Sequence, residues 1–377
     1  MGEFQPFVME HSMGKWEVEV EYNLSESGVH PVALRSLLDD DPERINHLLD
    51  TELNYPQVNG TPGLRERIAA LYEGADAENV LVTVGAAEAN FIAASSLVGP
   101  GDNCVVMVPN YMQIWGVAKN CGAEVRTFSL KADEGWAVDT EQLRDNVDAN
   151  TRFIAVCNPN NPTGRVMTEA EIEALVSIAD AVGAWIIADE VYAGSERTTD
   201  TATASLYGRY DKVIAIGSLS KAYGLPGLRV GWAVAPADML ENFWYRHDYA
   251  AITTTMLANQ LGEVALAPEK RKQLLARTRE YIRSGYPVFE AWLEKHSNFY
   301  SVTPPDAAAI AFVRYEAEAD SLAVADAIRE LQSVLIVPGD HFHVPQHLRI
   351  SFGLPHDYLN TGLTRLHEAV IGFGSGT

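Results

Sequence analysis

The stretch that organises this chain is Gly217-Ser-Leu-Ser-Lys-Ala-Tyr-Gly-Leu-Pro-Gly-Leu-Arg-Val-Gly-Trp232. It connects two apolar runs, 212–216 and 230–235, that are typical of buried strands. Its serines and Arg229 are donors of the kind that hold a phosphate, and its glycines allow a ligand close to the backbone. Lys221 has apolar and aromatic neighbours, which makes it a candidate for losing its proton and acting as an amine nucleophile. The alternative is a surface turn whose lysine and arginine are solvated.

Composition limits the class of protein. At 377 residues the chain exceeds what one core usually supports, which predicts two domains. Its 51 acidic and 28 basic residues give a formal charge of −23, which argues against nucleic acid or an anionic membrane as a partner. Three cysteines, two of them in apolar runs, indicate buried free thiols. The chain starts without signal-peptide features and has no apolar run long enough to span a bilayer, so we expect a cytoplasmic protein.

Apolar runs alternate with helical patterns between residues 80 and 235. The strands are expected at 80–84, 104–108, 124–130, 153–157, 185–188, 213–216 and 230–235. The helices between them are expected at 86–98, 112–121, 140–148 and 168–182. This alternation predicts an α/β fold with a mostly parallel, seven-stranded sheet sandwiched by helices. Thr168 and Glu171 predict a capping box at the start of the helix at 168–182. Thr140 is expected to cap the start of the helix at 140–148.

The remaining sequence predicts a second, smaller unit. A long helical zone covers 239–294, with an interruption expected at Gly285 and Pro287. Short strands at 310–315, 334–337 and 348–352 then mix with helices at 322–331 and 360–371, which is typical of an α+β domain. We therefore predict an N-terminal arm, partly in the small domain, at 1–45, a large domain at 46–265 and a small C-terminal domain at 266–377.

Polar groups follow several predicted strands at their carboxyl ends, where open α/β sheets bind ligands. Gly85-Ala86-Ala87 opens a helix after the first strand, and its free N–H groups predict an anion site. Tyr111 offers an aromatic ring, 158–164 offers amides, and 189–192 offers a carboxylate and a phenol. Together with Lys221, these groups predict a phosphorylated aromatic cofactor joined to lysine.

The motifs in this crevice resemble a known family. Asn158-Pro-Asn-Asn-Pro-Thr-Gly164, Asp189-Glu-Val-Tyr192 and the stretch around Lys221 match fold type I pyridoxal-phosphate enzymes of the class I/II, aspartate aminotransferase-like family. Pro338-Gly-Asp-His-Phe342 and Leu348-Arg-Ile-Ser-Phe352 match the carboxy-terminal pattern of that family. The similarity runs from about Asn23 to the last helix. It implies pyridoxal 5′-phosphate as cofactor and the large domain of a PLP-transferase.

The resemblance implies a role for each group around the cofactor ring. Lys221 would form the internal aldimine, a Schiff base, and then move the proton between Cα and C4′. Asp189 would pair with the pyridine nitrogen and keep it protonated. Asn161 and Tyr192 would hydrogen-bond the phenolate oxygen and tune the pKa of the Schiff base. Tyr111 would stack on the ring, unless it belongs to the core.

The cofactor phosphate would be held by donors from two segments. These donors are Gly85, Ala86, Ala87, Ser218, Ser220 and Arg229. The family often carries a hydroxyl residue at the start of the helix, where this chain has alanines. Backbone N–H groups would therefore supply that part of the phosphate site.

The resemblance also implies how substrate is held. Arg349 would grip the α-carboxylate bidentately, unless it makes a structural ion pair. Asn161 and the backbone of Gly28 would contact the substrate as well. Tyr55 resembles the tyrosine that reaches the phosphate of the neighbouring subunit, which implies a homodimer with shared active sites.

Three histidines, His341, His343 and His347, form an H-x-H-x-x-x-H cluster. Neither a cysteine nor a carboxylate pattern accompanies them, so we predict no metal site. His343 is an alternative candidate for lining the substrate pocket.

Three functions compete. The first is a transaminase that moves an amino group between an amino acid and a 2-oxo acid by a ping-pong route. The second is PLP-dependent elimination, replacement or cyclisation, since Ser27-Gly28-Val29-His30 loosely resembles the capreomycidine-synthase branch. The third is a non-catalytic regulator that keeps the fold, which the joint presence of Lys221, Asp189 and Arg349 disfavours.

Overall fold

The computed structural model describes residues 4–374. Met1 to Glu3, part of the start considered for a signal peptide, lie outside the described residues. Within residues 4–374, the helices are all too short or too polar to cross a membrane. Cys104 and Cys157 are buried free thiols, as the sequence predicts.

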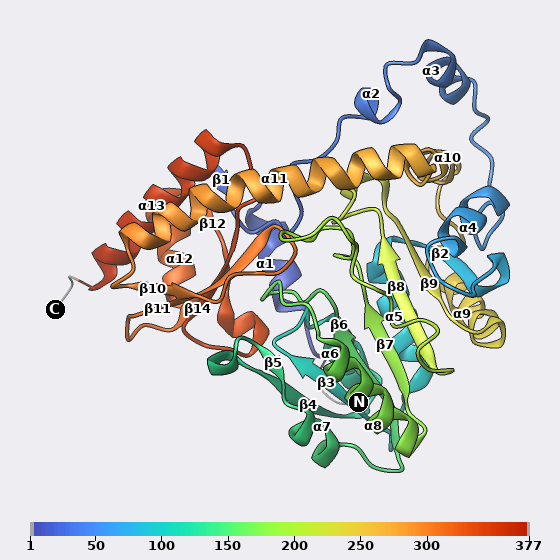
Figure 1. Cartoon of the computed structure of the whole chain (residues 1–377), viewed down its shortest axis with the longest axis horizontal. Helices are drawn as coiled ribbons and strands as arrows, with labels where there is room; N and C mark the ends of the chain where they lie inside the picture. Colours follow the sequence, from blue (N-terminus) through green and yellow to red (C-terminus); the bar gives the residue numbers. More distant parts are fainter. Residues whose placement is uncertain (1–3, 375–377) are drawn as a thin grey trace.

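An eight-stranded sheet forms the centre of the larger part of the molecule (Figure 1). Its order is β2-β9-β8-β7-β6-β3-β4-β5. The strands are β2 (Val80–Val84), β3 (Asn103–Val108), β4 (Glu124–Lys131), β5 (Ala137–Val138), β6 (Thr151–Cys157), β7 (Trp185–Asp189), β8 (Val213–Ser218) and β9 (Val230–Val234). β8, β7, β6, β3 and β4 pair in parallel, whereas β9 and β5 are antiparallel to their neighbours. The predicted fold is confirmed, with one strand added, because the two-residue β5 is too short to show a sequence period.

Helices cover both faces of this sheet, because alternate residues of each strand point to opposite sides. One face packs against α5 (Gly85–Leu97), α6 (Gln113–Asn120) and α9 (Ala237–Ala250) through Ala155, Ile187 and Ile214. The other face packs against α7 (Thr140–Asn146) and α8 (Glu169–Val182) through Ile154, Val156 and Ile186. Further along that face lie α4 (Pro62–Ala69) and α10 (Met256–Ala265), near α2 (Leu34–Leu37) and α3 (Pro42–Leu49).

The smaller part is built around an antiparallel sheet of order β10-β11-β14-β13. Its strands are β10 (Tyr300–Val302), β11 (Ile310–Tyr315), β13 (Val337–Pro338) and β14 (His347–Ser351), flanked by α12 (Ser321–Gln332) and α13 (His356–Gly374). The arm joins this part, because β1 (Tyr22–Asn23) pairs in parallel with β12 (Val334–Leu335). The boundaries proposed above, 1–45, 46–265 and 266–377, stay a prediction.

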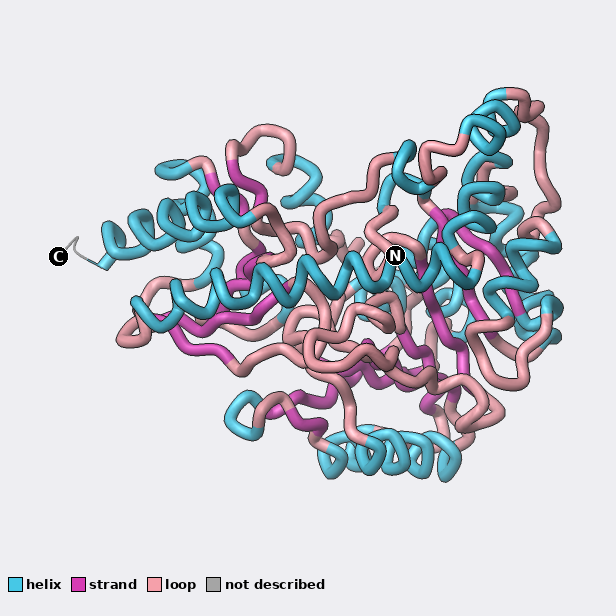
Figure 2. Tube along the Cα trace, turned by 45° about the horizontal axis from the view of Figure 1, so that its top comes forward, coloured by secondary structure: helices cyan, strands magenta, loops and turns pink. Residues whose placement is uncertain are grey.

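One long helix, α11 (Pro268–Lys295), runs across the top of Figure 1 from the large sheet to the small one, and crosses the front of Figure 2. The interruption predicted at Gly285 and Pro287 is wrong as a break, since α11 passes through both residues, and a kink there stays a prediction. A Cβ at Gly285 would meet the carbonyl oxygen of Phe352 at 2.0 Å, so glycine serves close packing there. The predicted helical zone instead breaks between α9 and α10 and between α10 and α11.

The two predicted helix caps have different outcomes. Thr168 and Glu171 form the capping box: Thr168 Oγ1 accepts the Glu171 N–H at 3.3 Å, and Glu171 Oε2 accepts the Thr168 N–H at 2.6 Å. The prediction for Thr140 is wrong, because the Asp139 side chain caps that helix through the N–H of Gln142 at 3.0 Å. A carboxylate one residue earlier serves equally well as an N-cap.

The strand directions bring six carboxyl ends to one edge of the large sheet. β9 runs against both β8 and β2, so β2 points the same way as β8, β7, β6, β3 and β4. The loops after these strands meet α1 (Val8–Trp16) and the arm at this edge. A ligand site is expected there.

Candidate active site

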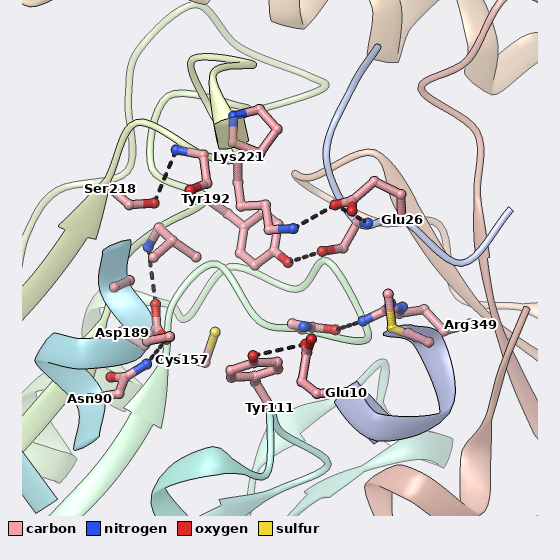
Figure 3. A pocket seen from close by; sticks show the side chains of 18 of the residues that line it. Glu10, Glu26, Asn90, Tyr111, Cys157, Asp189, Tyr192, Ser218, Lys221 and Arg349 are labelled. Atoms are coloured by element: carbon pink, nitrogen blue, oxygen red, sulfur yellow. Dashed lines mark hydrogen bonds and ion pairs between the residues drawn. The ribbon is translucent and has the colours of Figure 1, made fainter. Parts of the chain in front are cut away.

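A cavity of about 280 Å³ lies at this edge. Eleven of the predicted site residues line it: Ala86, Ala87, Tyr111, Asn161, Asp189, Tyr192, Ser218, Ser220, Lys221, Arg229 and Arg349. Figure 3 labels six of them, Tyr111, Asp189, Tyr192, Ser218, Lys221 and Arg349. The first four lie at or just after the ends of strands, Lys221 lies in the turn after β8 and Arg349 lies on β14, whereas Ala86 and Ala87 lie at the start of α5. The arm and α1 supply Glu10, Met13, Glu17, Glu26 and Ser27, which the sequence analysis did not predict.

Lys221 lies in the connection between β8 and β9. This connection contains a short 3-10 helix, Pro226–Leu228. Its Nζ is 2.6 Å from Oε1 of Glu26, which reaches it from the arm (Figure 3). Burial lowers the pKa of Lys221, but the charge of Glu26 and the phenol of Tyr192 outweigh it, so the pKa is raised. The apolar neighbours of Lys221 favour loss of its proton, whereas the structure places the Glu26 carboxylate beside the amine, and this favours the charged form.

Asp189 ends β7 and lies deep in the cavity. Its Oδ2 accepts a hydrogen bond from Nδ2 of Asn90 at 2.9 Å, and its Oδ1 accepts one from the N–H of Val191 at 3.2 Å. Burial raises the pKa of Asp189, and these two donors together with the charge of Lys221 counter that rise. The carboxylate is thus held in a fixed orientation at the bottom of the site.

Arg349, on β14, is 2% exposed and lies against the loop after β6. Its Nη1 donates to Oδ1 of Asn161 at 3.0 Å, and its Nη2 donates to the carbonyl oxygen of Ser25. Within residues 4–374, its Nε has no hydrogen-bond partner although it is buried. A donor of this kind is costly to leave unpaired, so it marks a place for an acceptor from a ligand.

The two phenols of the cavity are also oriented by arm residues. The Tyr192 hydroxyl donates to Oγ of Ser27 at 2.8 Å, and burial raises the pKa of Tyr192 to about 12. The Tyr111 hydroxyl donates to Oε1 of Glu10 at 2.9 Å, and burial raises its pKa as well. Tyr111 packs edge-to-face on Phe7, with ring centroids 5.0 Å apart, so the α1 end of the chain fixes its position.

An anion cradle forms where β2 turns into α5. Gly85 has φ +74°, and a Cβ there would lie 2.4 Å from Nη2 of Arg229. The first N–H groups of a 13-residue helix, the Arg229 guanidinium and the Ser218 hydroxyl therefore surround one small space. This donor set fits a phosphate group.

Four other residues considered in the sequence, Gly28, Tyr55, His343 and His347, lie outside the cavity lining. A Cβ at Gly28 would be 3.7 Å from Cδ of Lys221, so the Gly28 backbone borders the site. Tyr55 is 79% exposed, and its predicted contact would be with a partner subunit. His343 packs edge-to-face on Trp115, and His347 stacks on Phe312. Within the described chain no group of three or more His, Cys, Asp or Glu residues could hold a metal.

Comparison with known proteins identifies the family. The model of "Aminotransferase class I and II" matches residues 23–366. The chain belongs to the class I and II aminotransferases. Its cofactor is accordingly pyridoxal 5′-phosphate, as the sequence resemblance implies.

Relatives in this family point to more than one reaction. The chain is 30% identical over 357 residues to the capreomycidine synthase of Streptomyces vinaceus, covering 93% of this chain and 90% of that protein. A PLP-dependent aminotransferase from Streptococcus suis 89-1591 superposes with a TM-score of 0.92 at 30% identity, over 100% of both chains. The PLP-dependent cyclase OrfR superposes with a TM-score of 0.88 at 27% identity, over 99% of both chains.

The cavity of this class I and II aminotransferase fits its cofactor. The cradle at Gly85 and Arg229 suits the phosphate, Asp189 suits a protonated ring nitrogen, and Lys221 lines the same cavity. Arg349 Nε is left for a further acceptor, and this matches a substrate carboxylate.

Glu26, Glu10 and Asn90 were missed for different reasons. Asn90 follows Ala86 by four residues, so both lie on one face of α5, and that spacing was an available signal. Glu26 and Glu10 enter the cavity because the arm pairs with a strand more than 300 residues away in sequence. No local pattern predicts that pairing.

Proposed function

We propose that the chain is a transaminase that moves an amino group between an amino acid and a 2-oxo acid. The observation that carries this proposal is one cavity that contains both a lysine amine and a buried arginine with an unpaired donor. An α-carboxylate on Arg349 brings the amino group and the α-carbon of an amino acid toward Lys221. The same placement suits a 2-oxo acid, which carries the same carboxylate.

The bound cofactor supplies an electron sink for the α-carbon and a carrier for the amino group. Lys221 Nζ would take the proton from the substrate α-carbon and deliver it to C4′, the cofactor carbon that carried the aldehyde oxygen. Asp189 would keep a proton on the ring nitrogen, and Asn90, which donates to its carboxylate, would hold that carboxylate in place. Tyr192 and Asn161 line the cavity and would donate hydrogen bonds to the ring oxygen, while the phosphate would be bound by Ser218, Ser220, Arg229 and the N–H groups of Gly85–Ala87.

Helix α1 and the arm limit access of water to this chemistry. Met13, Glu10 and Ser27 lie over the cavity, and Met13 Sδ is 3.7 Å from Nη2 of Arg349. A covered site strengthens the electrostatic contacts inside it. We also propose a homodimer in which Tyr55 of one chain reaches the phosphate site of the other, since Tyr55 is exposed on an extended loop.

Elimination, replacement or cyclisation is the second candidate. It is supported by the similarity to capreomycidine synthase over most of both chains and to the cyclase OrfR. The groups that bind cofactor and α-carboxylate would be the same. The two candidates differ in the fate of the amino group, which is transferred to the cofactor only in transamination.

The half-reaction separates them. The purified enzyme is mixed with single amino acids, without a 2-oxo acid, and its absorbance is followed. Transamination predicts loss of the lysine-bound absorbance, gain of the shorter-wavelength band of the amine form of the cofactor, and one equivalent of 2-oxo acid. If a panel of twenty amino acids and their basic homologues leaves the spectrum unchanged, while mass spectrometry finds a dehydrated or cyclised product, the second candidate replaces the first. Lys221→Ala is the control and should give neither outcome.

A further inference from the structure

Glu26 is the arm carboxylate that contacts the reactive amine. Its Oε1 accepts hydrogen bonds from Nζ of Lys221 at 2.6 Å and from the backbone N–H groups of Ser27 at 2.9 Å and Gly28 at 3.1 Å. The two backbone donors fix the carboxylate independently of the lysine. The backbone of the arm therefore fixes the position of the Glu26 carboxylate, and the contact with Lys221 does not depend on two freely rotating side chains.

The backbone that carries Glu26 is anchored on both sides. The N–H of Leu24 donates to the carbonyl of Leu335 at 2.8 Å, and the carbonyl of Leu24 accepts from Ser351 at 2.9 Å. The N–H of His30 donates to the carbonyl of Gly353 at 3.0 Å. These bonds tie the arm to the smaller part of the molecule, so the position of that part determines where Glu26 lies.

The charges around the amine favour its ammonium form. Lys221 faces Glu26 from the arm, Tyr192 and Asp189 from the end of β7, and Arg349 from β14. The nearby charge of Lys221 lowers the pKa of Glu26 to about 2 against the opposing effect of burial. The pair is thus an ion pair across the whole physiological range.

We propose that Glu26 is a positioning residue that holds Nζ of Lys221 before the cofactor binds. It aims the amine into the cavity and keeps it protonated. Joining requires that the ammonium give one proton to solvent. The nitrogen lone pair then forms a bond to the aldehyde carbon of pyridoxal 5′-phosphate, and the aldehyde oxygen leaves as one water. Glu26 therefore sets the pH dependence of cofactor loading, a step that precedes both transamination and cyclisation.

The test follows loading of the cofactor-free, full-length chain. Pyridoxal 5′-phosphate is added between pH 6.5 and 10, and the rate at which the lysine-bound absorbance appears is measured. In Glu26→Gln the loading rate at pH 7.5 should rise about tenfold, and the pH profile of that rate should move to lower pH by about one unit. The reason is that an adjacent opposite charge shifts a pKa by about one to three units, and the Lys221 amine loses such a charge in this variant. Glu26→Asp keeps the charge and should restore most of the wild-type profile. Glu19→Gln, an exposed glutamate of the same arm, is the control for net charge and should not move it.

Pyridoxine 5′-phosphate lacks the aldehyde, so it binds without forming a bond to Lys221. It therefore separates non-covalent binding of the cofactor from formation of that bond. Its affinity for Glu26→Gln reports the loss of repulsion between a carboxylate and the anionic cofactor, without any bond to Lys221. The proposal is overturned if the pH profile of the loading rate in Glu26→Gln coincides with that of the wild type. It is also overturned if Glu19→Gln shifts the profile as much as Glu26→Gln does. A third contrary result is a rise in the loading rate of Glu26→Gln that is no larger than the rise in its affinity for pyridoxine 5′-phosphate.

If Glu26→Gln does not fold, the wild-type chain still decides. Lysine labelled with ¹³C at Cε reports the charge of each amine, and Lys221→Arg assigns the signal. The Lys221 amine should remain an ammonium at about pH 10, where an ordinary lysine is partly neutral. A signal that titrates below that pH overturns the proposal.

Discussion

Asn90 holds Asp189 from a different layer of the fold. Nδ2 of Asn90, on α5, lies 2.9 Å from Oδ2 of Asp189, at the end of β7. Both side chains are buried, and burial by itself favours the neutral carboxyl. The amide donor offsets that preference, so a residue on the helix that begins the phosphate cradle also supports the charge beneath the ring.

Asn90→Ala should slow turnover without removing the cofactor. A hydrogen bond to a charged group contributes about 1.5–3 kcal/mol, so kcat is expected to fall about tenfold or more. Ser96→Ala is the matched control, because Ser96 lies on the same helix and its hydroxyl, within residues 4–374, bonds only to the backbone oxygen of Ile92. Equal kcat values for Asn90→Ala and the wild type would remove Asn90 from this role.

Arg349→Lys should weaken binding of the amino donor more than it slows turnover. Lysine keeps the charge but loses the planar fork and the bond from Nη1 to Asn161. We expect KM for the donor to rise about tenfold, as for the loss of one charged hydrogen bond, with a smaller change in kcat. Arg314→Lys, on the neighbouring strand β11, changes a half-exposed arginine paired with Glu316 and should leave KM unaltered. A donor KM that is the same in Arg349→Lys and Arg314→Lys would contradict the assignment.

The strand ends were predictable and the arm was not. Lys221, Asp189 and Asn161 each follow an apolar run, and parallel strands bring their carboxyl ends together, so local patterns suffice to place them in one crevice. The position of Glu26 depends on the pairing of Tyr22 with Val334, which is a long-range contact without a local signature. The raised pKa of Lys221 was not predictable for the same reason, since its apolar neighbours are adjacent in sequence and its carboxylate partner is not.

Helix α11 shows a second limit of prediction from the sequence alone. Glycine and proline predict a break when a helix is considered in isolation. In the fold, the missing Cβ of Gly285 admits the carbonyl of Phe352, and Tyr286 and Phe289 on either side of Pro287 are buried in the core of the smaller part. Burial of these aromatic side chains outweighs the local preference, which a single-sequence pattern does not report.

Glu190 should make the chain less stable as the pH rises. Burial raises its pKa to about 7, while its Oε1 accepts the N–H of Leu206 at 2.8 Å. The folded chain therefore binds a proton that the unfolded chain releases, and stability falls between about pH 4.5 and pH 7, on the order of 3 kcal/mol for this group. Glu190→Gln keeps the acceptor and cannot ionise, so its unfolding temperature should fall less than that of the wild type between pH 5 and pH 8. The exposed Glu173→Gln is the control, and a parallel fall in all three proteins would contradict the prediction.

Gly85→Ala tests the phosphate cradle with the least chemical change. At φ +74° an added Cβ is strained, and it would stand 2.4 Å from Nη2 of Arg229, so the guanidinium must leave its place beside the helix start. Loss of the charged contact from Arg229 to the phosphate, about 1.5–3 kcal/mol, predicts that the Kd for pyridoxal 5′-phosphate, measured by equilibrium dialysis, rises about tenfold or more. Gly227→Ala, in the turn between Lys221 and Arg229, adds a Cβ that meets no atom within 4 Å and should leave Kd unchanged. If both variants bind the cofactor as the wild type does, the space between Gly85 and Arg229 is not where the phosphate lies.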